Sequence, residues 1–247
     1  MLLALFTIQL AAGLYVFLPL VGRRAVGVKF YRLVLIISGA LAVIAVAAHL
    51  NAGQQPLAEF DGIALVSTAL VWFVLRYPKR LVFRASATLL GIAYVVASIA
   101  AYDSAIRPSN LFWSVLGSLS TIALLGSVNL AMTLGHWYLV VRGMPIDPLK
   151  RLTIATLVAG IAKLILVFTA ILAGGAWHEV AIRQGIFFWM RAGWGLGGPL
   201  LLFPMVWGTV KIRSTMAATG ILYVDVVAVV IGEVLGAWLS ALVHLPV

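Results

Sequence analysis

Long runs of apolar residues, separated by short polar segments, make up most of this sequence. A helix that crosses about 30 Å of hydrocarbon needs roughly 20 such residues. Eight segments of this kind fit the sequence, and the ends of each are predicted to within a few residues. They cover about 2–21, 31–50, 61–76, 84–102, 111–141, 151–173, 185–210 and 217–243. The pattern predicts an all-α polytopic membrane protein, a bundle of eight transmembrane helices with short loops.

No linker or shift in composition divides the chain, so we expect a single integral-membrane helical domain over residues 1–247. The first residues, MLLALFTIQLAAGLYVFLPL, are apolar from the start. They have neither a basic leader nor a cleavage signal of small residues, which are the marks of a removable signal peptide. We therefore interpret them as the first spanning helix.

Basic residues alternate from loop to loop along the predicted spans. The loops after the first, third, fifth and seventh spans contain Arg23, Arg24, Lys29, Arg32, Arg76, Lys79, Arg80, Arg84, Arg142, Lys150, Arg151, Lys211 and Arg213. The remaining loops contain Arg107 and Arg183 with the acids Glu59, Asp61, Asp103 and Glu179. Because cytoplasmic loops carry the excess of Lys and Arg, this pattern predicts basic loops in the cytoplasm and both termini on the non-cytoplasmic side of a bacterial inner membrane.

The composition agrees with a lipid bilayer as the main partner and argues against nucleic acid. Hydrophobic residues make up 64% of the chain and charged residues only 10%, against about a quarter charged in soluble domains. The net charge of +10 arises from the loop clusters rather than from a basic binding face. The absence of cysteine excludes disulfides, thiolate–zinc sites, thiolate-bound iron–sulfur clusters and covalent c-type haem.

A lysine, Lys163, interrupts the apolar run AGIAKLILV of the sixth span. From the helical rise it lies about 18 Å from the basic side, and Glu233 and Asn129 lie at about 20–24 Å and 20 Å. A charge near the bilayer centre costs on the order of 3 kcal/mol or more. Glu233 is the acid at that depth, so we predict that it pairs with Lys163. Glu233 belongs to GEVLG, a G-x-x-x-G motif that lets helices approach closely, and we expect the sixth and eighth spans to touch there.

A second polar level lies nearer the basic side. By the same rise, His136 lies about 9 Å deep and Asp225 about 8–12 Å deep. Spacings of seven and eight residues place His136 and Asp225 on the same helix faces as Asn129 and Glu233, respectively. Together Asn129, His136, Lys163, Asp225 and Glu233 form a candidate proton or ligand track. A structural ion pair, an interhelical hydrogen bond and an interfacial histidine remain the alternatives.

The seventh span, RAGWGLGGPLLLFPMVWG, combines several glycines with Pro199. These residues disfavour a straight helix, and broken helices occur where freed backbone groups line a site. The span is either a kinked packing helix or a backbone site for an anion or lipid headgroup. Arg191, which precedes the break, is expected near the outer headgroups.

Cofactor sites have little support in the sequence. His49, His178 and His244 all map to the outer side without the spacing typical of metal ligands, so we expect no metal site. A haem b site is disfavoured, although His49 with His178 or His244 stays open as a ligand pair. A quinone ring could enter from the cytoplasmic leaflet beside His136 and Asp225.

Eight helices with buried acid, lysine and histidine groups are similar in outline to the membrane quinol-oxidising subunits of bacterial redox complexes. That outline implies a proton-handling or quinone-interacting subunit with further protein subunits as partners. A proton- or ion-coupled carrier of a small solute is the rival hypothesis, and a non-catalytic assembly factor is the third. No catalytic motif decides whether the chain is an enzyme.

Overall fold

The computed structural model describes residues 1–75, 80–141 and 143–247, and every regular element within them is helical. The elements, in chain order, are α1 (Leu2–Val21), α2 (Arg23–Asn51), α3 (Gln55–Val74), α4 (Arg80–Ile106), α5 (Leu111–Val140), α6 (Asp147–Ala173), η1 (His178–Arg183), α7 (Gly185–Trp189), η2 (Met190–Gly197), α8 (Gly198–Lys211) and α9 (Thr215–Val243). The labels η1 and η2 mark π-helical segments, which are wound more loosely than an α-helix.

The predicted membrane spans are confirmed in number and kind. Within the described residues, eight helical stretches are long and apolar enough to cross a membrane, and α7, η2 and α8 together form the seventh, Gly185–Lys211. Two helix starts differ most from the prediction. The second helix begins at Arg23 and is interrupted at Gly27, and the third begins at Gln55 instead of residue 61. Pro56 explains the earlier start of α3, because proline is favoured in the first helical turn.

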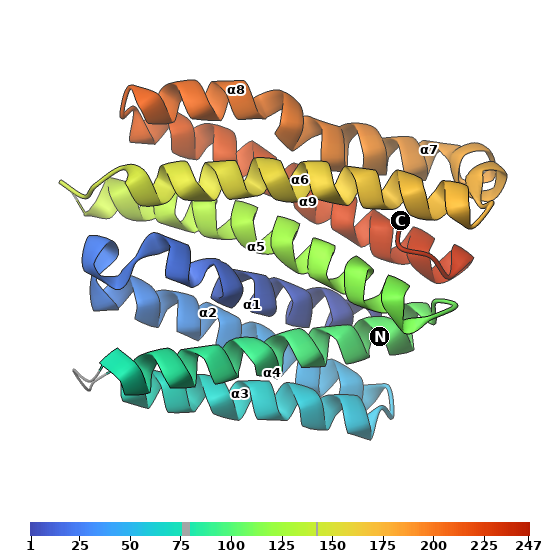
Figure 1. Ribbon diagram of the computed structural model, residues 1–247, viewed down its shortest axis with the longest axis horizontal. Coiled ribbons are helices and arrows are strands. Elements are labelled where there is room, and N and C mark those ends of the chain that lie inside the picture. Colours follow the sequence, from blue (N-terminus) through green and yellow to red (C-terminus); the bar gives the residue numbers. More distant parts are fainter. Residues whose placement is uncertain (76–79, 142) are drawn as a thin grey trace.

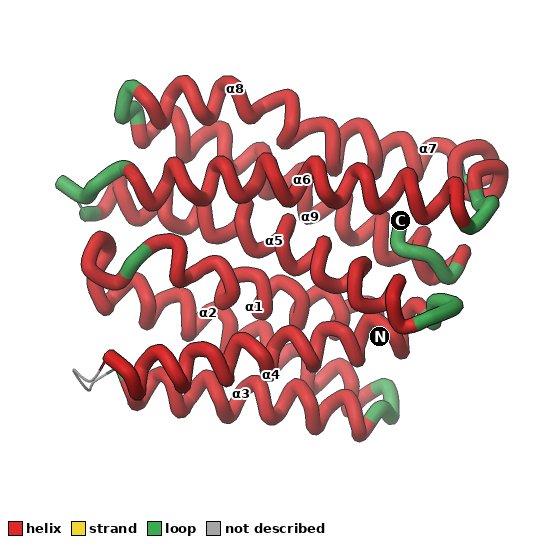
Figure 2. The backbone as a smooth tube through the Cα atoms, in the orientation of Figure 1, coloured by secondary structure: helices red, strands yellow, loops and turns green. Residues whose placement is uncertain are grey.

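The helices form two groups that meet along α1 and α5 (Figure 1). Helices α1–α4 make up one group, and α5, α6, η2, α8 and α9 make up the other. Figure 2 shows the connecting loops gathered at the two ends of the bundle. We call the end with the α1–α2, α5–α6 and α8–α9 connections the basic end. The first and last residues lie toward the opposite end, and which end faces the cytoplasm stays a prediction.

Glycine pairs allow the closest helix contacts. A Cβ atom at Gly13 of α1 would lie 2.5 Å from the main-chain oxygen of Ile122 and 2.6 Å from the Cα of Gly126, both in α5. A Cβ at Gly232 of α9 would lie 2.5 Å from the Cα of Gly195 in η2. Small residues at such crossings let backbones approach within van der Waals distance in a bilayer. The helix backbones can therefore pack directly against each other at these two crossings, because glycine has no side chain.

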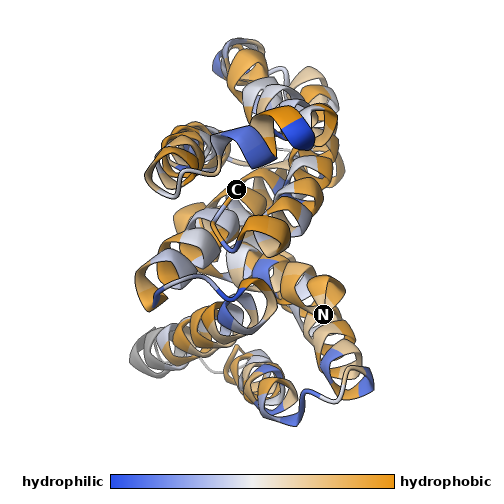
Figure 3. Cartoon of the chain, turned by 90° about the vertical axis from the view of Figure 1, so that its right-hand side faces the viewer, coloured by the Kyte–Doolittle hydropathy of each residue, from blue (hydrophilic) through white to orange (hydrophobic). Residues whose placement is uncertain are grey.

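Most of the helical ribbon is coloured hydrophobic in Figure 3, and the hydrophilic colour lies mainly at the loops and helix ends that face the viewer. Leu201, Leu89 and Ile165 are 78%, 67% and 61% exposed, a pattern that suits contact with lipid. Polar and charged side chains, in contrast, lie buried inside both helix groups.

Candidate functional site

Lys163 of α6 and Glu233 of α9 meet inside the bundle, as the sequence predicts. The Lys163 Nζ atom lies 3.5 Å from Glu233 Oε2, and the two side chains are only 2% and 3% exposed. The glycines around Glu233, however, do not pack against α6 as expected. Gly232 packs against Gly195 in η2, and the long lysine side chain reaches across to the carboxylate.

A hydroxyl group joins the two charges. Lys163 Nζ donates a hydrogen bond of 2.7 Å to Thr121 Oγ1 of α5. The Thr121 hydroxyl in turn donates a bond of 3.0 Å to Glu233 Oε2. A hydroxyl can accept and donate at the same time. The ammonium group, the hydroxyl and the carboxylate thus form an unbroken chain of hydrogen bonds across α6, α5 and α9.

The position of Arg191 differs from the one predicted from the sequence. It was expected near the outer headgroups, yet its side chain is fully buried, and its Nη2 lies 2.8 Å from Glu233 Oε1. The angles of this contact do not meet those of a hydrogen bond, so it is an ion pair held by charge. The reason for the inward position is the glycine of α9 beside it. A Cβ at Gly236 would lie 2.6 Å from Arg191 Nε, so a larger residue would close the space that the guanidinium occupies.

The charges of this cluster do not balance. We call Thr121, Lys163, Arg191 and Glu233 the charge cluster; fully ionised, it holds two cations and one carboxylate. Burying an uncompensated charge is strongly unfavourable. Arginine keeps its proton in proteins, so among these four residues the surplus falls when Lys163 gives up a proton. A main-chain oxygen of Val247 also lies close to Arg191, since both approach the Cβ position of Gly236. Among the described residues, Arg191 Nε and Nη1 have no hydrogen-bond partner.

A cavity of about 10 Å³ adjoins the charge cluster, lined in part by Gln9, Tyr102 and Ser240. That volume is close to the smallest that holds one water molecule. Gln9 Nε2 is buried and has no hydrogen-bond partner within the described part of the chain. The cluster is thus flanked by neutral polar groups and not only by hydrocarbon.

The other predicted track residues lie apart from the cluster. Asn129 is buried, and its Nδ2 donates to the main-chain oxygen of Leu125 in its own helix at 2.8 Å. Asp225 is 3% exposed, and its Oδ1 has no partner among the described residues. His136 is exposed, with Nδ1 3.5 Å from the hydroxyl of Tyr223. No contact joins these residues to one another or to the charge cluster in the described structure.

A buried histidine–aspartate pair was missed by the sequence analysis. His49 Nδ1 of α2 lies 2.7 Å from Asp61 Oδ2 of α3, and both residues are fully buried. The expected loop position of Asp61 is wrong, because α3 begins at Gln55 and places Asp61 inside the helix. Deeper in the same group, the hydroxyls of Thr68 and Tyr94 lie 2.9 Å apart. The first four helices therefore have a polar interior of their own.

The histidines do not gather at one place. His49 contacts Asp61, His244 Nδ1 lies 2.6 Å from the main-chain oxygen of Ile106, and His178 is exposed on η1. Within the described residues, no group of three or more His, Cys, Asp or Glu side chains is arranged to hold a metal ion. The acid and basic groups of the charge cluster are the stronger candidates for chemistry.

Comparison of the chain with protein-family models, with curated proteins and with solved structures finds no match. The eight apolar helices within the described residues make the chain a multi-pass membrane protein, and buried polar residues lie inside the bundle.

Proposed function

We propose that this membrane protein handles protons near the middle of the bilayer, as a subunit of a larger membrane redox complex. The observation that carries the proposal is the hydrogen-bonded chain from Lys163 through Thr121 to Glu233. When the Thr121 hydroxyl donates its proton to Glu233 and accepts one from Lys163, a proton is in effect transferred from Lys163 to Glu233. The product is a neutral amine beside a neutral acid, next to Arg191.

The surplus positive charge supports this role. An ion pair that served only to stabilise helix packing would need no more than one lysine and one carboxylate. Arg191 adds a second cation at 2.8 Å from the same carboxylate, so the surplus charge falls only when the proton taken from Lys163 goes on from Glu233 to a group outside the cluster. Ionisable groups inside membrane spans commonly mark proton relays and ion pathways.

Asp225 and His136 supply candidate groups toward the basic end. Asp225 is buried without a partner among the described residues, and a lone carboxyl in hydrocarbon is a candidate proton carrier. The pair of His136 and Tyr223 lies on the exposed surface. In this proposal a quinone from the bilayer approaches that surface, and Asp225 is a candidate proton carrier between the surface and the interior, although no side-chain contact within the described residues joins it to the charge cluster.

The proton-handling part is tested with the protein purified in mild detergent together with whatever subunits remain bound. The preparation is reconstituted into liposomes that contain a pH-sensitive dye, and a potassium diffusion potential drives proton entry. We expect proton flux well above that of empty liposomes. Lys163→Met should lower it at least ten-fold, whereas Lys211→Met, a change at an exposed lysine, should leave it unchanged. Equal flux for the wild type and Lys163→Met would refute the relay.

The redox part has its own test. Quinone extraction and a reduced-minus-oxidised absorption spectrum of the same preparation should show bound quinone and a redox-active partner, and His136→Ala should lower the activity of the complex. Absence of quinone, with no effect of His136→Ala, would end this part of the proposal.

An ion-coupled carrier of a small solute is the second candidate, favoured by the π-helical segment η2 that contains Arg191. π-Helical segments inside helices are frequently found at functional sites. A carrier moves its solute as a purified single chain, whereas a redox subunit needs its partner. Solute flux into liposomes that contain only this chain would favour the carrier over the redox subunit.

A further inference from the structure

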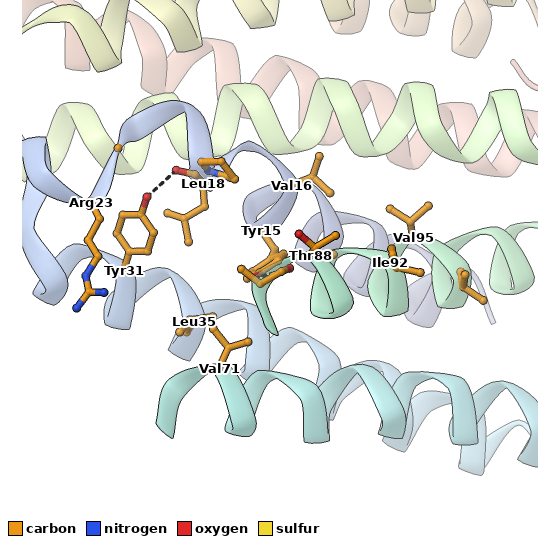
Figure 4. Close-up of a pocket in the computed structure, with 15 residues that line it drawn as sticks. Tyr15, Val16, Leu18, Arg23, Tyr31, Leu35, Val71, Thr88, Ile92 and Val95 are labelled. Atoms are coloured by element: carbon orange, nitrogen blue, oxygen red, sulfur yellow. Dashed lines mark hydrogen bonds between the residues drawn. The ribbon is translucent and has the colours of Figure 1, made fainter. Parts of the chain in front are cut away.

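A second site lies in the other helix group, at the basic end. A groove of about 700 Å³ runs between α1, α2, α3 and α4. Most of its lining is apolar, including Val16, Leu35, Val71 and Ile92. Figure 4 shows Arg23 and Tyr31 at one end of the groove and Val95 toward the other. The volume falls within the range of about 300–1,000 Å³ found for small-molecule sites.

The groove opens sideways, toward the lipid. Val16 of α1 is 40% exposed, and Ile92 and Val96 of α4 are 55% and 44% exposed. The lining of α4 runs from Ala87 to Val96, which is about 14 Å along the helix axis at 1.5 Å per residue. Since these edges face the bilayer, a ligand would enter from the membrane, and its long apolar part would lie along the helices.

The polar groups of the groove indicate which kind of membrane ligand fits it. The hydroxyl of Tyr15 donates to the main-chain oxygen of Ala87 at 2.8 Å, and that of Tyr31 donates to Leu18 at 3.2 Å. Both tyrosine protons are therefore engaged with the backbone and are not directed at a quinone carbonyl. The charged residue of the lining is Arg23, at the basic end of the groove. Its Nη2 donates to the main-chain oxygen of Leu75 at 3.2 Å, so a phosphate would share the guanidinium group with that carbonyl. A guanidinium group binds phosphate oxygens with charge-assisted hydrogen bonds.

We propose that this groove binds an acyl chain of an anionic phospholipid whose phosphate lies against Arg23. The apolar walls take the hydrocarbon, and the cation at the end of the groove selects the negative headgroup. Basic pockets between transmembrane helices are known to hold such headgroups. The site is separate from the charge cluster and does not depend on its function.

Gly91 offers a way to block the groove. A Cβ atom there would lie 3.6 Å from the Tyr15 ring, an ordinary contact, so the helix tolerates it. A leucine at this position would extend into the groove that Gly91 lines. Gly62 of α3 is the matched control, because a Cβ there meets nothing within 4 Å.

The test is native mass spectrometry of the full chain, exchanged from mild detergent into micelles that contain phosphatidylglycerol or phosphatidylcholine with the same acyl chains. We expect the wild type and Gly62→Leu to retain one phosphatidylglycerol and Gly91→Leu to retain none. Arg23→Gln should lower the preference for phosphatidylglycerol about five-fold, the effect of one basic contact of roughly the usual size. Arg213→Gln, at an exposed arginine in the α8–α9 connection, should leave the preference unchanged.

Three results would overturn the proposal. They are equal retention of the two lipids by the wild type, full lipid binding by Gly91→Leu, and a quinone in place of the phospholipid in the purified wild type. Helical circular dichroism shows whether Gly91→Leu folds. Val16→Trp repeats the block from an exposed edge of the groove, so that a folding defect in Gly91→Leu does not decide the outcome.

Discussion

Arg191 lies 2.8 Å from Glu233, on the carboxylate oxygen that Lys163 and Thr121 do not use. One carboxylate thus faces two buried cations from different helices. The single ion pair inferred from the sequence becomes a cluster with a surplus charge. This difference decides which substitutions the protein should tolerate.

Replacing Lys163 should lower the stability of the protein only slightly, whereas replacing Glu233 should lower it strongly. Lys163→Met leaves the Arg191–Glu233 pair neutral, so we expect a stability close to that of the wild type. Glu233→Gln leaves two buried cations without a counter-charge, which costs about 3–5 kcal/mol when a buried pair is broken. Unfolding in mixed detergent micelles measures both variants. Equal loss in the two variants would contradict the charge count.

The stability effects of replacing Arg191 and of replacing Lys163 should be strongly non-additive. Arg191→Met leaves the Lys163–Glu233 pair neutral, and Lys163→Met leaves the Arg191–Glu233 pair neutral. The double variant leaves Glu233 alone and buried, so its loss of stability should exceed the sum of the single losses by about 1–3 kcal/mol, the usual size of coupling within a charge network. The double-mutant cycle uses the same unfolding assay. Simple additivity would mean that the two cations do not share the carboxylate.

The contact between the two helix groups should depend on Gly13. Its added Cβ would lie 2.5 Å from the main-chain oxygen of Ile122, and backbone cannot move aside as a flexible side chain can. We expect Gly13→Ala to destabilise the protein by about 1–3 kcal/mol, the usual cost of overpacking. Gly208→Ala, where a Cβ meets nothing within 4 Å, is the control and should be neutral. Thermal unfolding in detergent compares the two variants.

The orientation in the membrane can be read from single cysteines, because the natural chain contains none. We expect an impermeant maleimide to label Ser109→Cys, in the α4–α5 connection, in intact spheroplasts. Ser214→Cys, in the α8–α9 connection, should react only after the membrane is opened. The reverse pattern would place the basic loops outside and refute the assignment from loop charge.

The sequence predicted the spans and the Lys163–Glu233 pair because both follow from the bilayer itself. Hydrocarbon thickness sets the length of the apolar runs, and the cost of a buried cation demands a counter-charge at the same depth. Neither the length of a span nor the need for a counter-charge depends on which helices are neighbours. Both can therefore be predicted without the arrangement of the helices.

Arg191 and His49 show where such reasoning fails. The depth of Arg191 was inferred from the expected end of its span, without the reach of its side chain or the space left by Gly236. The His49–Asp61 pair was missed because the start of α3 was placed at residue 61 instead of at Gln55. Asn129 and His136 share a helix face by spacing, but the sequence does not show that other helices cover Asn129 and leave His136 exposed.

The most direct test of the account is the proton flux of two variants at Thr121, measured in dye-loaded liposomes under a potassium diffusion potential. Thr121→Val removes the hydroxyl that joins Lys163 to Glu233 and keeps the shape of the side chain, so we expect the flux to fall at least ten-fold. Thr121→Ser keeps the hydroxyl and should retain most of the flux. Wild-type flux in the valine variant would contradict the relay at the centre of this account.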